Sequence, residues 1–244
     1  MRVVDVVARC LHRAGVETFF GVVGSGNFTF TVSLHALGAR FVAARHENGA
    51  VCMADAHARV GGSLGCVSVH QGPGLTNAMT GLTEAAKART PLVLVAADTP
   101  AGEVRSNFYV DQDKLAEAVG AVSVRVNRPR SAYADTMRAI RTAVGQRRAV
   151  LLNVPLDVAN AEAEWPQDAF AASVSPVIAF VSPGPWCTET HPRLPPTRAC
   201  ASAMQTAPFS WRAATNRAPS AWRLTVNVKL PLPTTPKNVS TPAR

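Results

Sequence analysis

The chain has 244 residues, of which 47% are hydrophobic and 17% charged, so it is long enough to bury a sizeable core and is not disordered throughout. Its apolar runs fall short of the roughly 18–20 residues that span a membrane, and charges interrupt the apolar pattern at the N-terminus. We therefore expect a soluble, unexported protein without membrane contact. Five cysteines without a CxxC pair fit neither a disulfide framework nor a zinc ribbon, which favours a reducing cytoplasm.

The net charge of +9 is concentrated near the C-terminus. Residues 171–244 contain eight Lys or Arg but one acid, Glu189, whereas residues 1–170 are nearly balanced, with 17 basic and 15 acidic groups. The same C-terminal segment holds 12 of the 18 prolines and one of the 16 glycines. Two different kinds of sequence are therefore joined in this chain.

Apolar spacing in the first part predicts an alternation of helices and strands. A helical pattern covers residues 3–14, and a β-prone run at 18–23 ends in a glycine turn. The following elements are a strand at 41–44, a helix at 46–59, a strand at 65–70, a helix at 75–88, a strand at 92–96, a helix near 114–119, a strand at 122–126, a helix at 132–144 and a strand at 149–154. This order predicts an α/β domain over residues 1–165, with a doubly wound, mainly parallel sheet of about six strands and helices on both faces.

Residues 166–244 form a tail rich in Pro, Arg and Thr that shows no sustained period of 2 or 3.6. We expect it to be irregular, disordered and not to fold with the domain. One interpretation is a basic arm that binds nucleic acid. The other, which we adopt as a hypothesis, is a high-GC coding sequence read out of frame, and on that hypothesis we expect no nucleic-acid partner.

Residues that carry chemistry cluster in RHENGAVCMADAHAR (45–59) and VSVHQGPGLTNAMTGLTEAAKARTPLVLVAAD (67–98). These segments resemble the N-terminal, pyrimidine-binding (PYR) domain of thiamine diphosphate enzymes, in particular the acetolactate synthase and benzoylformate decarboxylase group. The matching positions, in the family's order and spacing, are Arg45, His46, Glu47, Ala50, Ala54, Asp55, Ala58, Arg59, Gly72, Pro73, Gly74, Thr76, Asn77, Pro91 and Asp98. The resemblance runs from the first helix to NVPLDV (153–158).

The resemblance implies that Glu47 is the catalytic carboxylate. In the family, a glutamate at this position contacts N1′ of the aminopyrimidine, so that the 4′-amino group can take the proton from C2 of the thiazolium ring. A different explanation from the sequence alone is that Glu47 occupies the first turn of a helix, where an acid favours the helix dipole.

Other cofactor contacts follow from the same resemblance. The turn Gly72-Pro73-Gly74 brings the backbone close to a flat ring, and Asn77 either contacts the cofactor or orders the loop. Because ligand sites in parallel sheets lie beyond the carboxyl ends of the strands, we expect Gly24, Ser25, Glu47 and this turn to converge at one edge.

Substrate-facing residues are expected in the loops beside that turn. Ser25 matches a serine that contacts a substrate carboxylate in some family decarboxylases, although Val23 replaces the usual proline. His70 either shuttles protons or is a hydrogen-bonded residue of the strand edge. The full substrate-facing set is Gly24, Ser25, His70, Gln71, Phe108 and Gln112.

Several family features are missing from the sequence. No G-D-G motif, which in the family begins the Mg²⁺ and diphosphate site, occurs in the chain, and the middle domain that binds FAD in some relatives is absent. Histidines 35, 46 and 57 lack the spacing of metal ligands, so no metal site is expected. Cys52 and Cys66 are expected to be small core residues.

The sequence therefore predicts the thiamine diphosphate half-site of a truncated acetolactate synthase-like enzyme, inactive by itself. The parental reaction is decarboxylation of a 2-oxo acid with carboligation. The expected partner is the diphosphate-binding domain of another subunit or chain, and full-length relatives are expected to be homo-oligomers. Two alternatives remain open: a genuine small subunit that completes a 2-oxo acid decarboxylase in trans, and a non-catalytic module with a basic nucleic-acid-binding tail.

Overall fold

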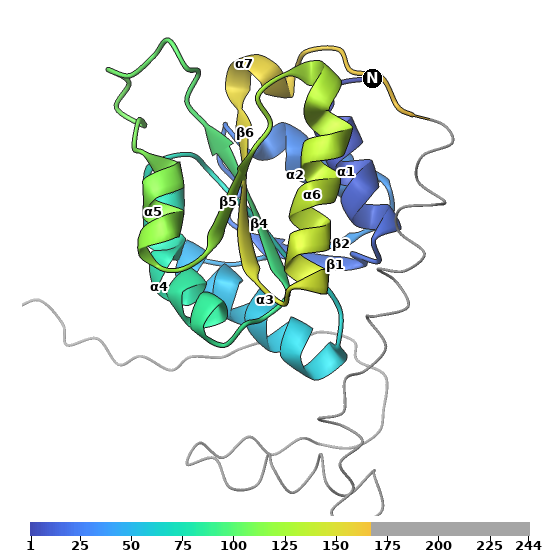
Figure 1. Cartoon of the computed structure of the whole chain (residues 1–244), viewed down its shortest axis with the longest axis vertical. Coiled ribbons are helices and arrows are strands. Elements are labelled where there is room, and N and C mark those ends of the chain that lie inside the picture. Colours follow the sequence, from blue (N-terminus) through green and yellow to red (C-terminus); the bar gives the residue numbers. More distant parts are fainter. Residues whose placement is uncertain (167–244) are drawn as a thin grey trace, which may run out of the picture. The chain divides into compact units, whose positions relative to one another are not determined.

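One sheet of six parallel strands forms the centre of the domain (Figure 1). The computed structural model describes residues 1–166, so the tail predicted over 166–244 lies, apart from Pro166, outside the described residues. The order across the sheet is β2-β1-β3-β4-β6-β5. The strands are β1 (Thr18–Gly21), β2 (Arg40–Ala43), β3 (Gly65–Val69), β4 (Leu92–Asp98), β5 (Val122–Arg125) and β6 (Ala149–Pro155).

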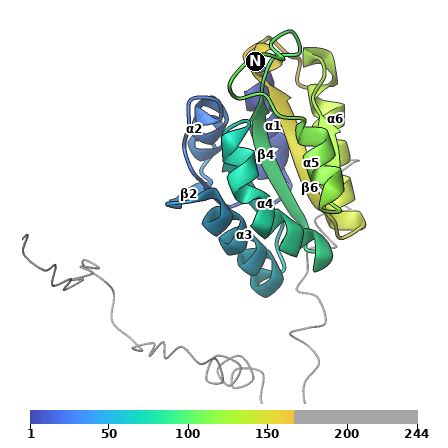
Figure 2. The ribbon, with the colours of Figure 1, turned by 90° about the vertical axis from the view of Figure 1, so that its left-hand side faces the viewer.

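Helices cover both faces of this sheet (Figure 2). Helices α1, α2 and α6 pack on one face, and α3, α4 and α5 pack on the other. The helical segments are α1 (Val3–Arg13), α2 (Phe28–Ala36), α3 (Glu47–Gly61), α4 (Pro73–Lys87), α5 (Gln112–Ala118), the 3₁₀ turn η1 (Pro129–Ser131), α6 (Ala132–Gly145) and α7 (Leu156–Ala159). This arrangement confirms the predicted α/β fold with a doubly wound parallel sheet.

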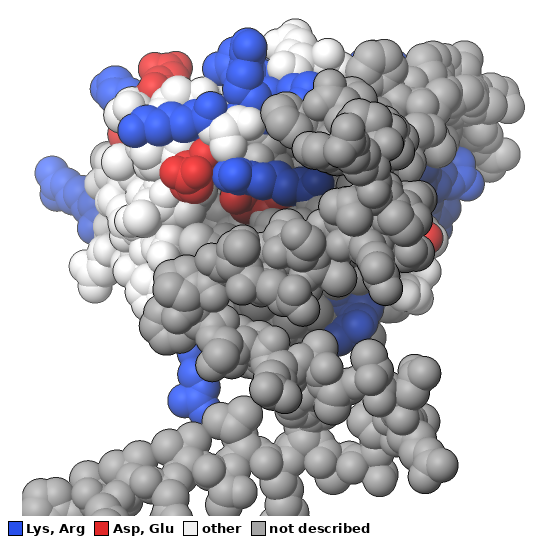
Figure 3. All heavy atoms as spheres, turned by 90° about the horizontal axis from the view of Figure 1, so that it is seen from below, with Lys and Arg blue, Asp and Glu red and all other residues white. Residues whose placement is uncertain are grey.

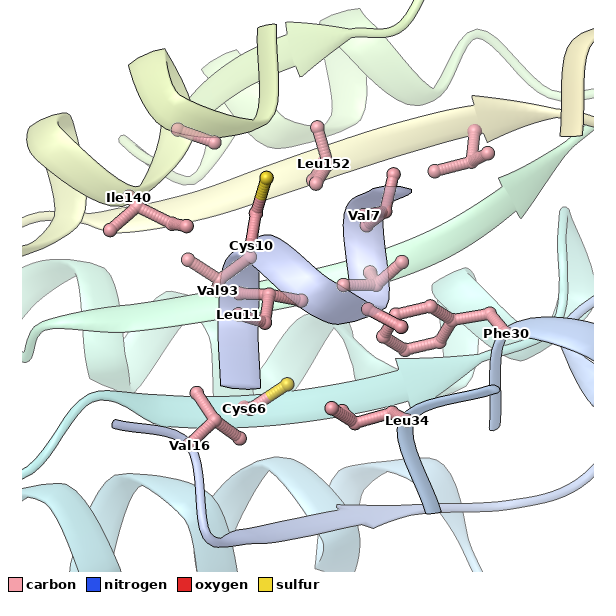
Figure 4. Packing of buried hydrophobic residues seen from close by; sticks show 14 of the residues in the cluster. Val7, Cys10, Leu11, Val16, Phe30, Leu34, Cys66, Val93, Ile140 and Leu152 are labelled. Carbon is pink, nitrogen blue, oxygen red and sulfur yellow. The ribbon is translucent and has the colours of Figure 1, made fainter. Parts of the chain in front are cut away.

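The core lies between the sheet and the helices on each face. Both β4 and β6 are buried at every position, which explains their almost continuous apolar sequences. Figure 4 shows the α1 face, where Cys10 and Leu11 of α1 lie among apolar side chains that include Val93 of β4 and Leu152 of β6. Burial raises the pKa of the Cys10 and Cys66 thiols to about 12, so both stay protonated at neutral pH.

Helix α2, the short helix α7 and the exposure of one cysteine were not predicted from the sequence. The segment that forms α2, FTFTVSLHA, is rich in aromatic and β-branched residues and has apolar side chains on all sides, so it shows no helical period. Packing of Phe30 and Leu34 in the core beside α1 outweighs that local preference. Cys66 is buried as expected, but Cys52 is exposed, because it lies on the outer side of α3.

The surface of the described domain carries charges of both signs. Seen from below, Lys and Arg side chains stand at separate places, some of them beside acidic residues (Figure 3). Among residues 1–166, no helix combines the length and apolar character needed to cross a membrane.

The chain reverses direction across the sheet between β1 and β3. From β1 it continues into α2 on one face, whereas from β3 it continues into α4 on the opposite face. The loops after these two neighbouring strands therefore diverge at the carboxyl edge of the sheet, and in folds of this kind ligands bind in the crevice outside the strands at such a point.

Candidate active site

Glu47 is the first residue of α3 and lies at this edge. Its side chain is only 9% exposed. Asn77 on the neighbouring helix α4 donates from Nδ2 to Oε2 of Glu47 over 3.1 Å. No residue in 1–166 donates a hydrogen bond to Oε1, so one oxygen of a largely buried carboxylate is left for another donor.

The Gly72-Pro73-Gly74 turn leads from β3 into α4 and lies beside that oxygen. Gly72 has φ 55° and ψ −106°, a conformation that strongly favours glycine, and Gly74 N donates to Gln71 O over 3.3 Å to close the turn. A Cβ on Gly72 would stand 2.1 Å from the carbonyl oxygen of Phe108. Both the backbone angle and this close approach therefore require glycine at position 72.

Gly74 lies close to His70 and near the Glu47 carboxylate. A Cβ at this position would lie 3.7 Å from Oε1 of Glu47 and 2.9 Å from Cβ of His70. Any side chain at position 74 would thus project into the volume between Glu47 and His70.

Ser25 and His70 meet across the crevice. Ser25 Oγ lies 3.2 Å from Nε2 of His70, and His70 Nδ1 lies 3.0 Å from the carbonyl oxygen of Gln71. A Cβ on Gly24 would stand 2.5 Å from Cδ2 of His70, so glycine is needed for the turn to approach the imidazole. The Phe108 ring also packs on His70, with ring centroids 5.1 Å apart, and is 45% exposed.

Asn27 holds the Ser25 turn and was not singled out from the sequence. Its Oδ1 accepts from Gly24 N over 2.8 Å, and its Nδ2 donates to Val22 O and to Oγ of the buried Ser68 on β3. An asparagine directly before a helix after a glycine turn is a recognised capping signal. That signal was available, but the predicted pattern lacked the helix that Asn27 precedes.

Two predicted substrate-facing residues are buried rather than exposed in the crevice. Gln71 is 5% exposed, and its Oε1 has no hydrogen-bond partner within the described residues. Gln112 is fully buried, and its amide bonds to Gly72 N, Ala97 O and Asn153 Oδ1. The structure therefore brings Gly24, Ser25, Glu47, His70, Gly74 and Asn77 around the crevice and places Gln112 behind the turn.

A second polar cluster lies farther along the same edge. Arg125 on β5 forms ion pairs with Asp98 and Asp113, the latter at 2.9 Å. Burial raises the pKa of the Asp98 carboxyl, against the opposing effect of the Arg125 charge. Asn153 Nδ2 donates to Asp113 over 2.8 Å and so connects β6 to the cluster. Residues 1–166 contain no group of three or more His, Cys, Asp or Glu side chains placed to hold a metal ion.

Comparison with known proteins identifies a matching family and similar sequences. Residues 1–118 match the family described as thiamine pyrophosphate enzyme, N-terminal TPP binding domain. The chain is 30% identical over 168 residues to the acetolactate synthase large subunit of Haemophilus influenzae, covering 67% of this chain and 29% of that protein. It is 36% identical over 156 residues to human 2-hydroxyacyl-CoA lyase 2, covering 62% of this chain and 24% of the lyase.

A solved structure shares the fold. The thiamine diphosphate-dependent 4-hydroxybenzoylformate decarboxylase of Rhodococcus jostii superposes with a TM-score of 0.63 and 26% sequence identity, over 72% of this chain and 33% of that chain. The chain thus spans about a third or less of the length of these three relatives.

Proposed function

Because residues 1–118 of this chain belong to the N-terminal domain family of thiamine pyrophosphate enzymes, we propose that the crevice is the aminopyrimidine half of a thiamine diphosphate site. The observation that supports this most directly is the Glu47 carboxylate. It is largely buried, lies near Gly74, and within residues 1–166 has neither a cationic partner nor a hydrogen-bond donor to Oε1. A buried carboxylate without a charged partner is costly unless a ligand compensates it.

The residues present suit an aminopyrimidine ring. Glu47 Oε1 would accept the proton carried by N1′, and Asn77 would keep the carboxylate turned toward the ring by holding Oε2. The turn Gly72-Pro73-Gly74 would border the ring without a side chain in its way. When bound, thiamine diphosphate supplies a carbanion at C2 of its thiazolium ring, which attacks carbonyl compounds.

On the substrate side, we assign the recognition of a 2-oxo acid to Ser25 and His70. The serine hydroxyl and the imidazole lie within hydrogen-bond distance of each other and border the same space as Gly74. Phe108 is partly exposed beside His70 and would contact an apolar part of the substrate. The parental reaction in this proposal is decarboxylation of the 2-oxo acid and transfer of the product carbanion to a carbonyl acceptor.

The chain would supply only half of this site. The other half, which holds the diphosphate and Mg²⁺, would come from a diphosphate-binding domain of another subunit or chain, and FAD would belong to full-length relatives only. A truncated enzyme and a genuine small subunit that acts in trans both fit this proposal. A neighbouring gene that encodes a G-D-G segment would favour the small subunit.

Calorimetry tests the half-site. The full chain is titrated with thiamine diphosphate and Mg²⁺, first alone and then with an acetolactate synthase fragment that lacks its own N-terminal domain. We expect no tight binding by the chain or the fragment alone and measurable binding by the mixture. Micromolar binding by the isolated chain would contradict the half-site, and a mixture that binds no better than its parts would contradict the cofactor role.

A further inference from the structure

The peptide group between Gln71 and Gly72 connects two residues that the sequence analysis treated separately. Its N–H, from Gly72, donates to Oε1 of Gln112 over 2.9 Å. Its carbonyl oxygen, from Gln71, lies 3.0 Å from Nδ1 of His70 and accepts from Gly74 N. The orientation of one peptide plane is therefore fixed from both sides, by Gln112 and by His70.

The orientation of the Gln112 amide is set by partners that can only accept. Nε2 of Gln112 lies 3.1 Å from the carbonyl oxygen of Ala97, so the NH₂ group must face it. The same nitrogen donates to Oδ1 of Asn153 over 2.8 Å, which uses its second proton. Oε1 therefore faces Gly72, and the side chain is fully buried.

The hydrogen-bond partners of His70 likewise determine which of its ring nitrogens carries the proton. A carbonyl oxygen carries no proton, so Nδ1 of His70 must be the donor to Gln71 O. In the neutral ring, Nε2 is then the unprotonated nitrogen, and the Ser25 hydroxyl 3.2 Å away donates to it. The lone pair of Nε2 faces the crevice at Ser25.

We propose that Gln112 is a positioning residue that acts through the Gln71–Gly72 peptide to hold His70 as the Nδ1–H tautomer, with Nε2 as the proton acceptor beside Ser25. Glycine at position 72 places little restraint on rotation of this peptide, so the Gln112 bond supplies the restraint that the backbone lacks. The part His70 plays toward a substrate rests on the proposed function, whereas the tautomer itself does not.

Ring-nitrogen NMR of the full chain tests this assignment without cofactor. The chain is labelled with ¹⁵N-histidine and studied at alkaline pH, where histidine rings are neutral. For wild type we expect the His70 shifts of an Nδ1–H ring. Gln112→Met removes the acceptor for Gly72 N–H, so the ratio of the Nδ1–H to the Nε2–H tautomer should fall about tenfold, as expected for the weakening of one hydrogen bond.

A further variant separates this effect from general destabilisation. Thr136→Val removes a different buried hydrogen bond, from Thr136 to Ala132 O on α6, and should leave His70 unchanged.

An Nε2–H ring in the wild-type chain would overturn the proposal, even if Gln112→Met failed to fold. Unchanged His70 shifts in folded Gln112→Met, or an equal shift in Thr136→Val, would overturn it too. None of these results bears on thiamine diphosphate binding, which the calorimetric mixture tests separately.

Discussion

Glu47 and Asp98 are both buried carboxylates at the carboxyl edge of the sheet, with 9% and 4% of their surfaces exposed, but their partners differ. Asp98 pairs with the Arg125 guanidinium, which also binds Asp113, and it accepts from Thr99 N. Within the described residues, Glu47 has one neutral partner, the Asn77 amide, and one oxygen without a hydrogen-bond donor. Arg125 compensates part of the charge of Asp98, whereas Glu47 has no cationic partner among residues 1–166.

We interpret this difference as that between a structural cluster at Asp98 and a candidate ligand site at Glu47. Removing a partner from the Asp98 cluster should change stability, because the protein itself compensates the charge there. Changing Glu47 should have little effect on stability and a large effect on chemistry, because its compensating group is proposed to be a ligand. Substitutions at Glu47 and in the Asp98 cluster test this contrast.

The largest effect is expected for Glu47→Gln in a reconstituted site, formed with a separately supplied diphosphate-binding domain. Glutamine keeps the size of the side chain but cannot stabilise a protonated pyrimidine. Exchange of the C2 proton of thiamine diphosphate should therefore slow by roughly two to four orders of magnitude, the range for loss of a positioned acid or base. Hydrogen–deuterium exchange at C2, followed by NMR, measures this rate.

His46→Gln is the matched control, since His46 precedes Glu47 and accepts from Asn48 N at the start of α3. It should change the exchange rate much less. Equal C2 exchange rates for wild type and Glu47→Gln would mean that the R-H-E motif has been misinterpreted. If Asp98→Asn slowed C2 exchange as much as Glu47→Gln, the two carboxylates would not differ in function.

Gly72→Ala should have the largest effect on stability. The new Cβ would meet the Phe108 carbonyl at 2.1 Å in a backbone conformation with φ 55°. We expect a loss of about 3 kcal/mol in the free energy of unfolding, from backbone strain together with displacement of the Phe108 segment. Urea denaturation measures it. Gly102→Ala is the control, because a Cβ there would have open space, and it should lower the free energy of unfolding by less than about 0.5 kcal/mol. Equal losses for Gly72→Ala and Gly102→Ala would show that the contact between Gly72 and the Phe108 carbonyl is not rigid.

Arg125→Met tests the charge-compensated cluster. It leaves Asp98 buried without its cation, so the variant should lose about 1–3 kcal/mol near neutral pH. The pKa of Asp98 already lies above its ordinary value of 3.8, so its ionised form costs stability as the pH rises through the folded-state pKa, and removal of Arg125 increases that cost. The loss of unfolding free energy in Arg125→Met relative to wild type should therefore shrink as the pH falls toward 3.8.

Denaturation curves at several pH values measure this deficit. Arg138→Met, which breaks the more exposed pair with Asp135 on α6, should cost less than about 1 kcal/mol. A deficit for Arg125→Met that does not vary with pH would indicate lost packing rather than an uncompensated carboxylate.

Much of the fold and the location of the site could be predicted from the sequence, because both depend on strand order. The apolar strands of a parallel sheet and the polar turns that follow them place Ser25, Glu47 and Gly72 at one edge whatever their detailed contacts. The roles of Asn27 and Gln112 could not be predicted in this way. Their partners lie 41 residues away in the chain, at Ser68 and Asn153, and the direction of each amide depends on the packed neighbours. Helix α2 was missed for a related reason, since contacts with α1, and not its own periodicity, stabilise it.

The smallest effect is expected at Asp5, a carboxylate paired at the surface near the start of α1. Partial burial favours the neutral form of Asp5, but hydrogen bonds from Arg2 and Ser33 outweigh it and lower the pKa of Asp5 below 3.8. A lowered pKa in the folded state means that the ionised form stabilises the protein above pH 3.8 and that this contribution disappears as the pH falls through the folded-state pKa. Asp5→Asn should therefore lose no more than about 1 kcal/mol at neutral pH, as for an exposed ion pair, and should match wild type in strong acid. For Asp98 the dependence has the opposite sign, since its raised pKa makes the ionised form a net cost, so Asp98→Asn should gain stability relative to wild type as the pH rises through the folded-state pKa of Asp98. Thermal unfolding of both variants across the acidic range measures how their stability relative to wild type depends on pH. The same pH dependence for Asp5→Asn and Asp98→Asn would show that burial does not distinguish these carboxylates.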